Sequence, residues 1–198
     1  MNKDSRIRAI EAARELMMVK GKDGVRMQEI ADHAGINKGL LHYYFKSKNN
    51  LFQEVFKEEL ESLFGHVTDL MKSENLLEEK ISIIIDHYFN HLTDHGKRSS
   101  FVLFEINKDP SLVKLTDIDS AFSKAVFVLD ESLKNHGLIS SPELSFQVLM
   151  NIISLCVFPF MSEPLGKKFL KERGTNWRSL MNQRRDFLKN LILSSLRS

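Results

Sequence analysis

The stretch that decides the fold is Met27–Lys48, MQEIADHAGINKGLLHYYFKSK, which predicts two short helices joined by a tight turn. In its first half, Ile30, Ala31 and Ala34 are spaced i, i+1 and i+4, so they fall on one face of a helix. Gly35 follows directly, and glycine at this position favours a left-handed C-terminal cap because it has no Cβ. The spacing therefore predicts a helix that is buried on one side and ends at a sharp turn.

The second half of the stretch predicts another short helix, from Asn37 to Phe45. Asn37 can accept a hydrogen bond from the first free amides of this helix, as asparagine does at many helix N-termini. Leu41, Tyr44 and Phe45 then repeat at i, i+3 and i+4 and form its inner face. A helix shorter than about 12 residues is marginal in isolation, so this one depends on packing against its neighbours.

The outer face of this second helix carries side chains that suit a nucleic acid, namely Lys38, Gly39, Leu40, His42 and Tyr43. Lysine, histidine and tyrosine can donate hydrogen bonds to phosphate oxygens, and leucine can contact a thymine methyl group. The glycine costs roughly 1 kcal/mol inside a helix but lets another backbone approach closely. An αα-hairpin with a mixed polar face has similar spacing, so spacing alone leaves both interpretations open.

The residues from Ile30 to Leu51, IADHAGINKGLLHYYFKSKNNL, resemble the motif of the TetR family of bacterial transcriptional regulators, whose usual pattern is IAxxAGVSxGxLYxYFxSKxxL. Three positions depart from the family. Asn37 stands where serine is usual, His42 replaces the usual tyrosine, and Arg26 stands where a threonine usually caps the preceding helix. The last two departures concern the details of phosphate contact and not the fold. The motif covers about the first quarter of the chain, and the remainder agrees with the family in length and helical character.

The resemblance implies an all-α homodimer with a three-helix helix-turn-helix DNA-binding domain (residues 1–48) and a helical effector-binding and dimerisation domain (residues 49–198). It implies a transcriptional regulator, a repressor released by a small-molecule effector, that binds double-stranded DNA at an inverted-repeat operator. No cofactor is expected. The candidate DNA-binding residues are Gln28, Asn37, Lys38, Gly39, Leu40, His42, Tyr43 and Lys48.

The composition predicts a globular protein with an uneven distribution of charge. The chain has 198 residues, of which 42% are hydrophobic and only four are proline, so it can form a packed core. Residues 1–48 hold ten Lys and Arg against six Asp and Glu, whereas the remainder holds 18 against 20. An excess of positive charge in the N-terminal part fits a nucleic-acid surface there, although the motif carries more weight.

The sequence predicts a cytoplasmic protein without a membrane span. Residues 1–14 are charged throughout and contain no apolar signal-peptide core. The longest apolar stretch, Val148–Met161, is interrupted by Asn151, Ser154 and Pro159 and is shorter than the ~20 residues of a membrane-spanning helix. The single Cys156 cannot form an internal disulfide and is expected to be a small buried residue.

Apolar periodicity predicts helices along the rest of the chain. Ser47 is expected to cap a long helix that enters the second domain, with Lys48 beside its N-terminus, where free amides attract a phosphate. Gly65 is the expected weak point of that helix, and the helix that begins after Ser141 is apolar nearly all round, which favours a partner subunit. The predicted helices are Ser5–Val19, Ser47 to about Lys72, Leu76–His95, Arg98–Leu115 with a break at Asp109-Pro110, Ile118–His136, Pro142–Val157 ended by Pro159 and Pro164, and Trp177 to about Leu196.

Two further groups of residues suggest binding sites in the second domain. A possible metal face is formed by His87, His91 and His95, which recur every fourth residue with Asp94 adjacent. The row drifts around the helix, so the three side chains need not converge, and histidines at the flank of the apolar stripe are the better interpretation. No metal site is therefore predicted. Aromatic residues at helical spacing are candidates for an effector pocket, although a role in the core alone explains each equally well. They are Tyr88, Phe89, Phe101, Phe104, Phe122 and Phe158.

Two other classes of function stay open. One is a DNA-binding adaptor of the same fold without a small-molecule effector. The other is a helical protein that binds an apolar ligand and has lost DNA binding, which the intact outer face of residues 37–43 disfavours. No catalytic constellation, strand pattern, repeat or phosphate-binding glycine loop appears in the sequence, so an enzyme is not expected.

Overall fold

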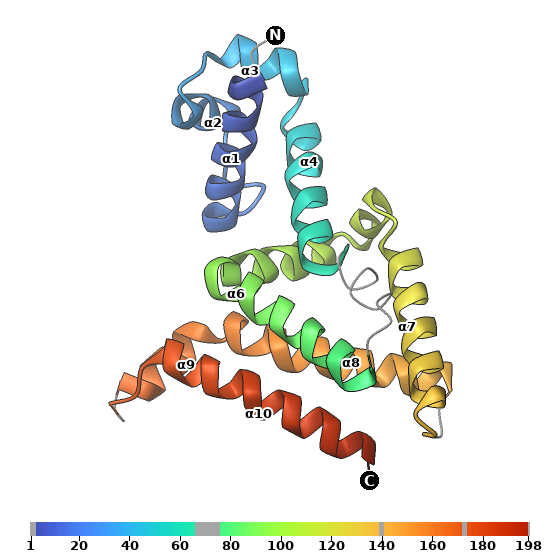
Figure 1. Cartoon of the computed structure of the whole chain (residues 1–198). Helices are drawn as coiled ribbons and strands as arrows, with labels where there is room; N and C mark the ends of the chain where they lie inside the picture. The colour runs from blue at the N-terminus through green and yellow to red at the C-terminus, as the bar shows by residue number, and fades with distance from the viewer. Residues whose placement is uncertain (1–2, 66–75, 139–140, 172–173, 198) are drawn as a thin grey trace. The chain divides into compact units, whose positions relative to one another are not determined.

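The computed structural model describes residues 3–65, 76–138, 141–171 and 174–197, and all regular structure in these ranges is helical (Figure 1). The all-α prediction is therefore confirmed. The chain divides into two compact units: unit 1 comprises Met1–Ser62 and Phe101–Thr116, and unit 2 comprises Leu63–Ser100 and Asp117–Ser198. The predicted functional boundary between residues 48 and 49 is a different division, and it stays a prediction.

Unit 1 has α1 at its centre. α1 packs against α2 and α4, and its inner face buries Ala13 and Met17 completely. On α4, Phe52 and Phe56 contact Phe101 of α6, with ring centroids 6.2 and 6.4 Å apart. These contacts bury the apolar faces of helices that are too short to persist alone. The elements of the unit are α1 (Lys3–Lys20), α2 (Met27–Ala34), α3 (Lys38–Phe45), α4 (Lys48–Leu60), the end of α6 (Leu77–Lys108) and the 3₁₀ helix η2 (Pro110–Leu115).

A buried charge cluster joins α1 to α4. The side chain of Arg14 is 8% exposed, and its Nε lies 2.6 Å from a carboxylate oxygen of Glu59, which is 2% exposed. Its terminal nitrogens also pair with Glu11 and Glu58. Burial alone would lower the pKa of Arg14, but the hydrogen bond to Glu11 and the three carboxylate charges raise it above its usual value. Arg14 therefore stays charged inside the unit.

The helix that begins after Ser47 is shorter in its regular part than predicted. The Ser47 hydroxyl accepts a hydrogen bond from the Asn50 amide at 3.1 Å, so the predicted cap is confirmed. α4 ends at Leu60 and is followed by a π-helical turn, η1 (Glu61–Gly65), which contains the glycine predicted as the weak point. The predicted continuation to Lys72 lies outside the described residues.

Unit 2 is a bundle in which α7 packs on α8 and α10 is tied to α6 by polar contacts. Asp86 of α6 pairs with Lys189 of α10 at 2.7 Å, and Asn90 accepts a hydrogen bond from Arg185 at 2.6 Å. Phe89 packs against Phe160 of α8 with ring centroids 5.7 Å apart. The elements are the first part of α6, α7 (Ile118–Asn135), α8 (Pro142–Met161), α9 (Glu163–Lys171) and α10 (Trp177–Arg197).

Two helix boundaries differ from the prediction, and one agrees with it. α6 (Leu77–Lys108) consists of two helical segments that meet at a kink, where His95 (φ −132°, ψ 26°) departs from helical geometry, so the expected end of a helix at His95 is confirmed. Pro159 does not end α8, because a proline so close to the C-terminus removes only one late hydrogen bond and the helix continues to Met161. Pro164 lies in the first turn of α9, a helix that was not predicted, and proline is well tolerated at that position.

The length of α8 also changes the membrane argument. Its 20 residues are apolar enough to span a membrane by length and composition alone, so the expectation that no segment reaches this length was wrong. Half of the helix is buried inside the unit, and the core helix of a soluble protein passes the same test. The observation is weak evidence for a membrane.

Candidate nucleic-acid interface

The turn between α2 and α3 has the geometry that the sequence predicts. Gly35 adopts φ 63° and ψ 37°, in the left-handed region that favours glycine. Its amide donates to the carbonyl of Asp32 at 3.2 Å, and the amide of Ile36 donates to the carbonyl of Ala31 at 3.0 Å. These two hydrogen bonds satisfy carbonyls at the end of α2, so the turn is fixed by local interactions.

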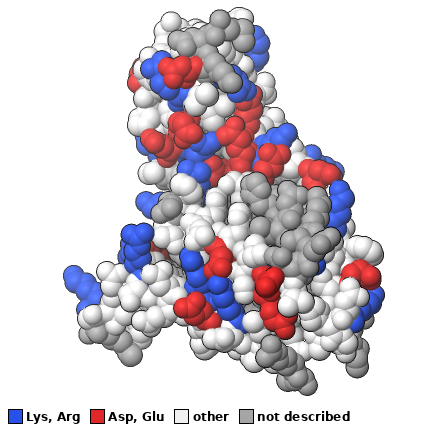
Figure 2. All heavy atoms as spheres, viewed as in Figure 1, with Lys and Arg blue, Asp and Glu red and all other residues white. Residues whose placement is uncertain are grey.

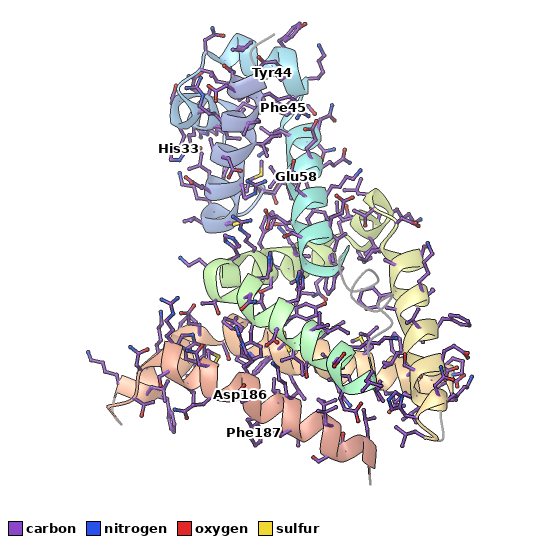
Figure 3. All side chains as sticks on the ribbon, in the orientation of Figure 1. His33, Tyr44, Phe45, Glu58, Asp186 and Phe187 are labelled. Carbon is purple, nitrogen blue, oxygen red and sulfur yellow. The ribbon has the colours of Figure 1, made fainter. Side chains whose placement is uncertain are left out.

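The second helix, α3, is held by a cap and by two buried side chains. The Asn37 side chain accepts a hydrogen bond from the Leu40 amide at 2.7 Å, as predicted. Leu41 and Phe45 are buried, and the guanidinium of Arg6 lies 5.4 Å from the centroid of the Phe45 ring. Figure 3 labels Phe45 where α3 approaches α4. The inner face of α3 is thus anchored, which leaves its other face free to contact a ligand.

The exposed face of α3 carries four of the five residues predicted there, and the fifth, Leu40, is half-buried. Lys38, His42 and Tyr43 are exposed, and Tyr43 keeps 61% of its surface accessible. Gly39 is also exposed, but a Cβ at this position would lie 3.2 Å from the Oδ1 of Asn37. The glycine therefore makes room for the helix cap, a reason that the sequence alone did not reveal.

Lys46 is a residue that sequence reasoning missed. It adopts φ 64° and ψ −44°, and it is the only described non-glycine residue with positive φ. The Ser47 amide donates to the carbonyl of Phe45 at 2.7 Å across it, which makes a γ-turn, a strained conformation for a residue with a side chain. Its ammonium lies 5.3 Å from the centroid of the Tyr43 ring. The turn places a lysine beside the exposed tyrosine of α3, and no residue-type signal in the sequence announces it.

The two remaining candidates lie at the N-termini of α4 and α2. The ammonium of Lys48 donates to the backbone carbonyls of Val25 at 3.0 Å and Asp23 at 3.5 Å, so it ties the loop before α2 to the start of α4. Gln28 is exposed in the first turn of α2 and donates to Asp32 at 2.7 Å. The structure thus places both on the same unit as α3, and their contact with DNA stays a prediction.

An ion pair neutralises Glu29 of α2, whereas Lys38, the lysine of α3, has no such partner among the described residues. A hydrogen bond from Lys20, 2.8 Å away, and another from the Arg26 amide lower the pKa of the Glu29 carboxyl. His33 lies 2.8 Å from Glu15. In the described ranges, no carboxylate pairs with Lys38. The Lys38 ammonium is therefore not neutralised by a described carboxylate.

The predicted effector-pocket residues are distributed over both units. Phe101 and Phe104 belong to unit 1, where Phe101 is part of the core and Phe104 is 58% exposed. Phe122 packs against Phe64 with ring centroids 5.5 Å apart, in unit 2. Phe158 is 67% exposed on α8. The role of these residues in binding an effector stays a prediction.

Tyr88 and Phe89 are buried in the core of unit 2, and Tyr88 carries an unusual polar group. Its hydroxyl is buried and finds no hydrogen-bond partner in the described part of the chain. Burial raises the pKa of Tyr88, and the nearby Cys156 thiol adds to the effect. Cys156 is itself fully buried, as predicted, and burial raises its pKa to about 12 although the Arg184 charge acts in the opposite direction.

The row of histidines on α6 gives no metal centre. The rings of His87 and His91 are stacked with centroids 6.3 Å apart, and His91 and His95 meet edge to face at 5.5 Å. Among the residues whose side chains are described, no group of three or more His, Cys, Asp or Glu is placed to hold a metal ion. The side chain of Asp94 lies outside that description.

Comparison with known proteins agrees with this geometry. The family model described as "Bacterial regulatory proteins, tetR family" matches residues 9–55. The chain is 25% identical over 173 residues to the probable HTH-type transcriptional regulator YttP of Bacillus subtilis, which covers 81% of this chain and 79% of that protein. It is 30% identical over 73 residues to the HTH-type transcriptional repressor KstR2 of Mycolicibacterium smegmatis, which covers 37% of this chain and 36% of that protein. The crystal structure of the transcriptional regulator FadR from Bacillus subtilis in complex with stearoyl-CoA shares the fold, with a TM-score of 0.62 at 20% identity over 92% of this chain and 97% of that chain.

Proposed function

We propose that this chain, a DNA-binding transcriptional regulator that belongs to the tetR family of bacterial regulatory proteins, represses transcription as a homodimer on an inverted-repeat operator and is released by a small-molecule effector. The observation that carries the proposal is the division of α3 into a buried face and an exposed polar face. Its Leu41 and Phe45 are buried while Lys38, His42 and Tyr43 face outward. A rigid helix with a polar, positively charged face is what the major groove of DNA accepts.

The roles of the contact residues follow from their chemistry and position. Tyr43 and Lys48 are proposed to hold phosphates, because hydroxyl and ammonium groups near helix ends contact the DNA backbone. Lys38 and Leu40 lie in the first turn of α3, the part of a recognition helix that reaches base edges. Phosphate contacts set affinity, whereas base contacts set sequence preference.

The proposed dimer rests on exposed apolar side chains of α8 and α10. Phe158 and Phe187 are 67% and 58% exposed, and an apolar groove of about 530 Å³ lies between them, lined also by Leu180 and Met181. Figure 3 labels Phe187 on α10. Monomeric proteins rarely expose large contiguous apolar patches, so a second copy that covers this surface is the economical explanation. Further exposed apolar residues of the two helices are Leu144, Phe146, Met150, Met161 and Leu191.

The buried Tyr88 hydroxyl supports an effector site in unit 2. An unsatisfied buried hydroxyl costs about 1–3 kcal/mol, and an apolar ligand with one hydrogen-bond acceptor could satisfy it. The FadR structure in complex with stearoyl-CoA supports an acyl compound as the ligand class. The dimer has a state that fits the operator and a state in which the recognition helices are misplaced. An effector that binds the misplaced state more tightly than the operator-fitting state would weaken operator binding, at most by the ratio of its affinities for the two states. A thermal-shift comparison of wild type and Tyr88→Phe with stearoyl-CoA and palmitate tests this, because a real effector raises the melting temperature of the wild type more.

Genome-wide mapping of bound DNA tests the proposed function. The experiment captures the protein from cells of its own host, where a regulator of this kind acts in the cytoplasm, and sequences the DNA that it holds. Wild type is expected to enrich a small set of sites that share an inverted repeat. Lys38→Ala should weaken the enrichment of that set and change the sequence that the enriched sites share. Uniform retention of DNA by wild type would contradict sequence-specific regulation.

A further inference from the structure

A second pocket in unit 2 is lined by none of the six residues predicted to bind the effector. It measures about 540 Å³ and lies between α9 and the first turns of α10. A volume of this size is typical of small-molecule sites and would admit a ligand about as large as a nucleotide. Its lining includes Lys167, Lys171, Trp177 and Arg178.

The rim of this pocket is positively charged. Lys167 and Lys171 are one helical turn apart on α9, and Arg178 lies in the first turn of α10. Lys167 pairs with Glu163 at 2.6 Å, but no carboxylate of the described ranges pairs with Lys171 or Arg178. Figure 2 shows Lys and Arg side chains projecting from the α9 end of this unit. Unpaired cations around a concave, low-dielectric surface attract anions.

The floor of the pocket is formed by buried apolar side chains. Phe160, Leu170 and Met181 each keep less than a tenth of their surface accessible. The indole of Trp177 packs so closely on α9 that a Cβ at Gly166 would lie 2.3 Å from its Cζ3 atom. Asn176 already accepts a hydrogen bond from the Arg178 amide at 2.7 Å, so the side chains, and not the helix terminus, provide the positive charge. A cationic rim over an apolar floor suits a ligand with an apolar or planar body and an anionic group.

We propose that this pocket binds an organic phosphate about the size of a nucleotide. Lys171 and Arg178 contact the phosphate oxygens, and the body of the ligand lies against Trp177 and Met181. Trp177 and Met181 also line the groove between α8 and α10, so a ligand in this pocket would touch residues that support the proposed dimer surface. The binding itself does not depend on DNA recognition.

Trp177 makes the proposal measurable, because it is the single tryptophan of the chain. The experiment titrates the full-length protein with ADP and with coenzyme A and records tryptophan fluorescence at fixed salt. Adenosine and inorganic phosphate are titrated in parallel to separate the organic body from the anion. At least one of ADP and coenzyme A should give a saturable change, with an apparent Kd at least tenfold lower than adenosine or phosphate gives.

Matched variants locate the site. Lys171→Gln and Arg178→Gln should each weaken binding about tenfold, as expected for loss of one charge-assisted hydrogen bond. Lys168→Gln is the control, because Lys168 is an exposed lysine of the same helix that does not line the pocket. No saturable change with either nucleotide, equal affinity for adenosine or phosphate, or unchanged binding by both pocket variants would overturn the proposal. The titration contains no DNA, so its failure is distinct from failure of the proposed regulatory function.

Discussion

Replacing Arg14 by methionine is the strongest test of how α1 is held to α4. Methionine matches the length of the arginine stem but removes the charge, which leaves Glu59 buried at 2% exposure opposite an apolar side chain. Breaking a buried ion pair by removing one partner typically costs about 3–5 kcal/mol. The pairs with Glu11 and Glu58 add little, because those carboxylates are 55% and 49% exposed and exposed pairs contribute about 0–1 kcal/mol.

The assay is urea unfolding of the full-length chain followed by far-UV circular dichroism, with hydrogen exchange of α1 amides to localise the effect to unit 1. Arg14→Met should lower the midpoint and remove protection from α1. The double variant Arg14→Met with Glu59→Met should recover most of the loss, because both charges are then gone. Arg8→Met is the matched control, since Arg8 is 48% exposed, forms its ion pair with an exposed Asp4 and donates only a long hydrogen bond of 3.4 Å to Ser5. A loss below about 1 kcal/mol for Arg14→Met would refute the argument from burial.

Three further predictions concern single residues. Lys46→Gly should raise the free energy of unfolding, measured by urea titration, by about 1 kcal/mol, because glycine relieves the positive φ of the γ-turn, whereas Lys46→Ala should not. Equal free energies of unfolding for the two variants would remove the strain argument. Lys48→Ala should weaken binding to operator DNA and to random DNA alike, and it should reduce the salt dependence of binding. Lys38→Ala should weaken binding and also change the preferred DNA sequence. An unchanged salt dependence for Lys48→Ala would contradict the phosphate contact. Cys156 should react slowly with iodoacetamide in the native protein at pH 8, because burial raises its pKa to about 12. The contribution of the buried thiol to the free energy of unfolding should be lost as the pH rises from about 9 toward 12. Rapid alkylation of the native protein would contradict the burial of Cys156.

The fold of the α2–α3 region was predictable because its determinants are local. Gly35 permits the positive φ at the end of α2, and Asn37 caps α3. These two residue types therefore predict where α2 ends and where α3 begins. The division of α3 into a buried and an exposed face also follows from residue spacing alone. The outer face could therefore be selected before any tertiary contact was known.

Other features depend on tertiary packing and could not be read from the sequence. The γ-turn at Lys46 arises where the anchored end of α3 meets the Ser47 cap, and lysine gives no signal for positive φ. The six aromatic candidates share helical spacing. Long-range contacts decide which of them are buried or exposed and to which unit each belongs. The pocket beside α9 could not be predicted, because a proline after an apolar helix indicates a helix end, whereas Pro164 lies in the first turn of α9.

The central claim is that a dimer places two copies of α3 in successive major grooves. Changing the spacing of the operator half-sites tests this claim most directly. The measurement is a binding titration at fixed salt on a natural inverted repeat and on the same site with about 5 base pairs inserted between its halves, which rotates one half-site to the far side of the duplex. A rigid dimer cannot follow that rotation, so affinity should fall toward the non-specific level, orders of magnitude weaker. Equal affinity for the two DNAs would mean that the subunits bind independently, and it would contradict the proposed dimer mechanism.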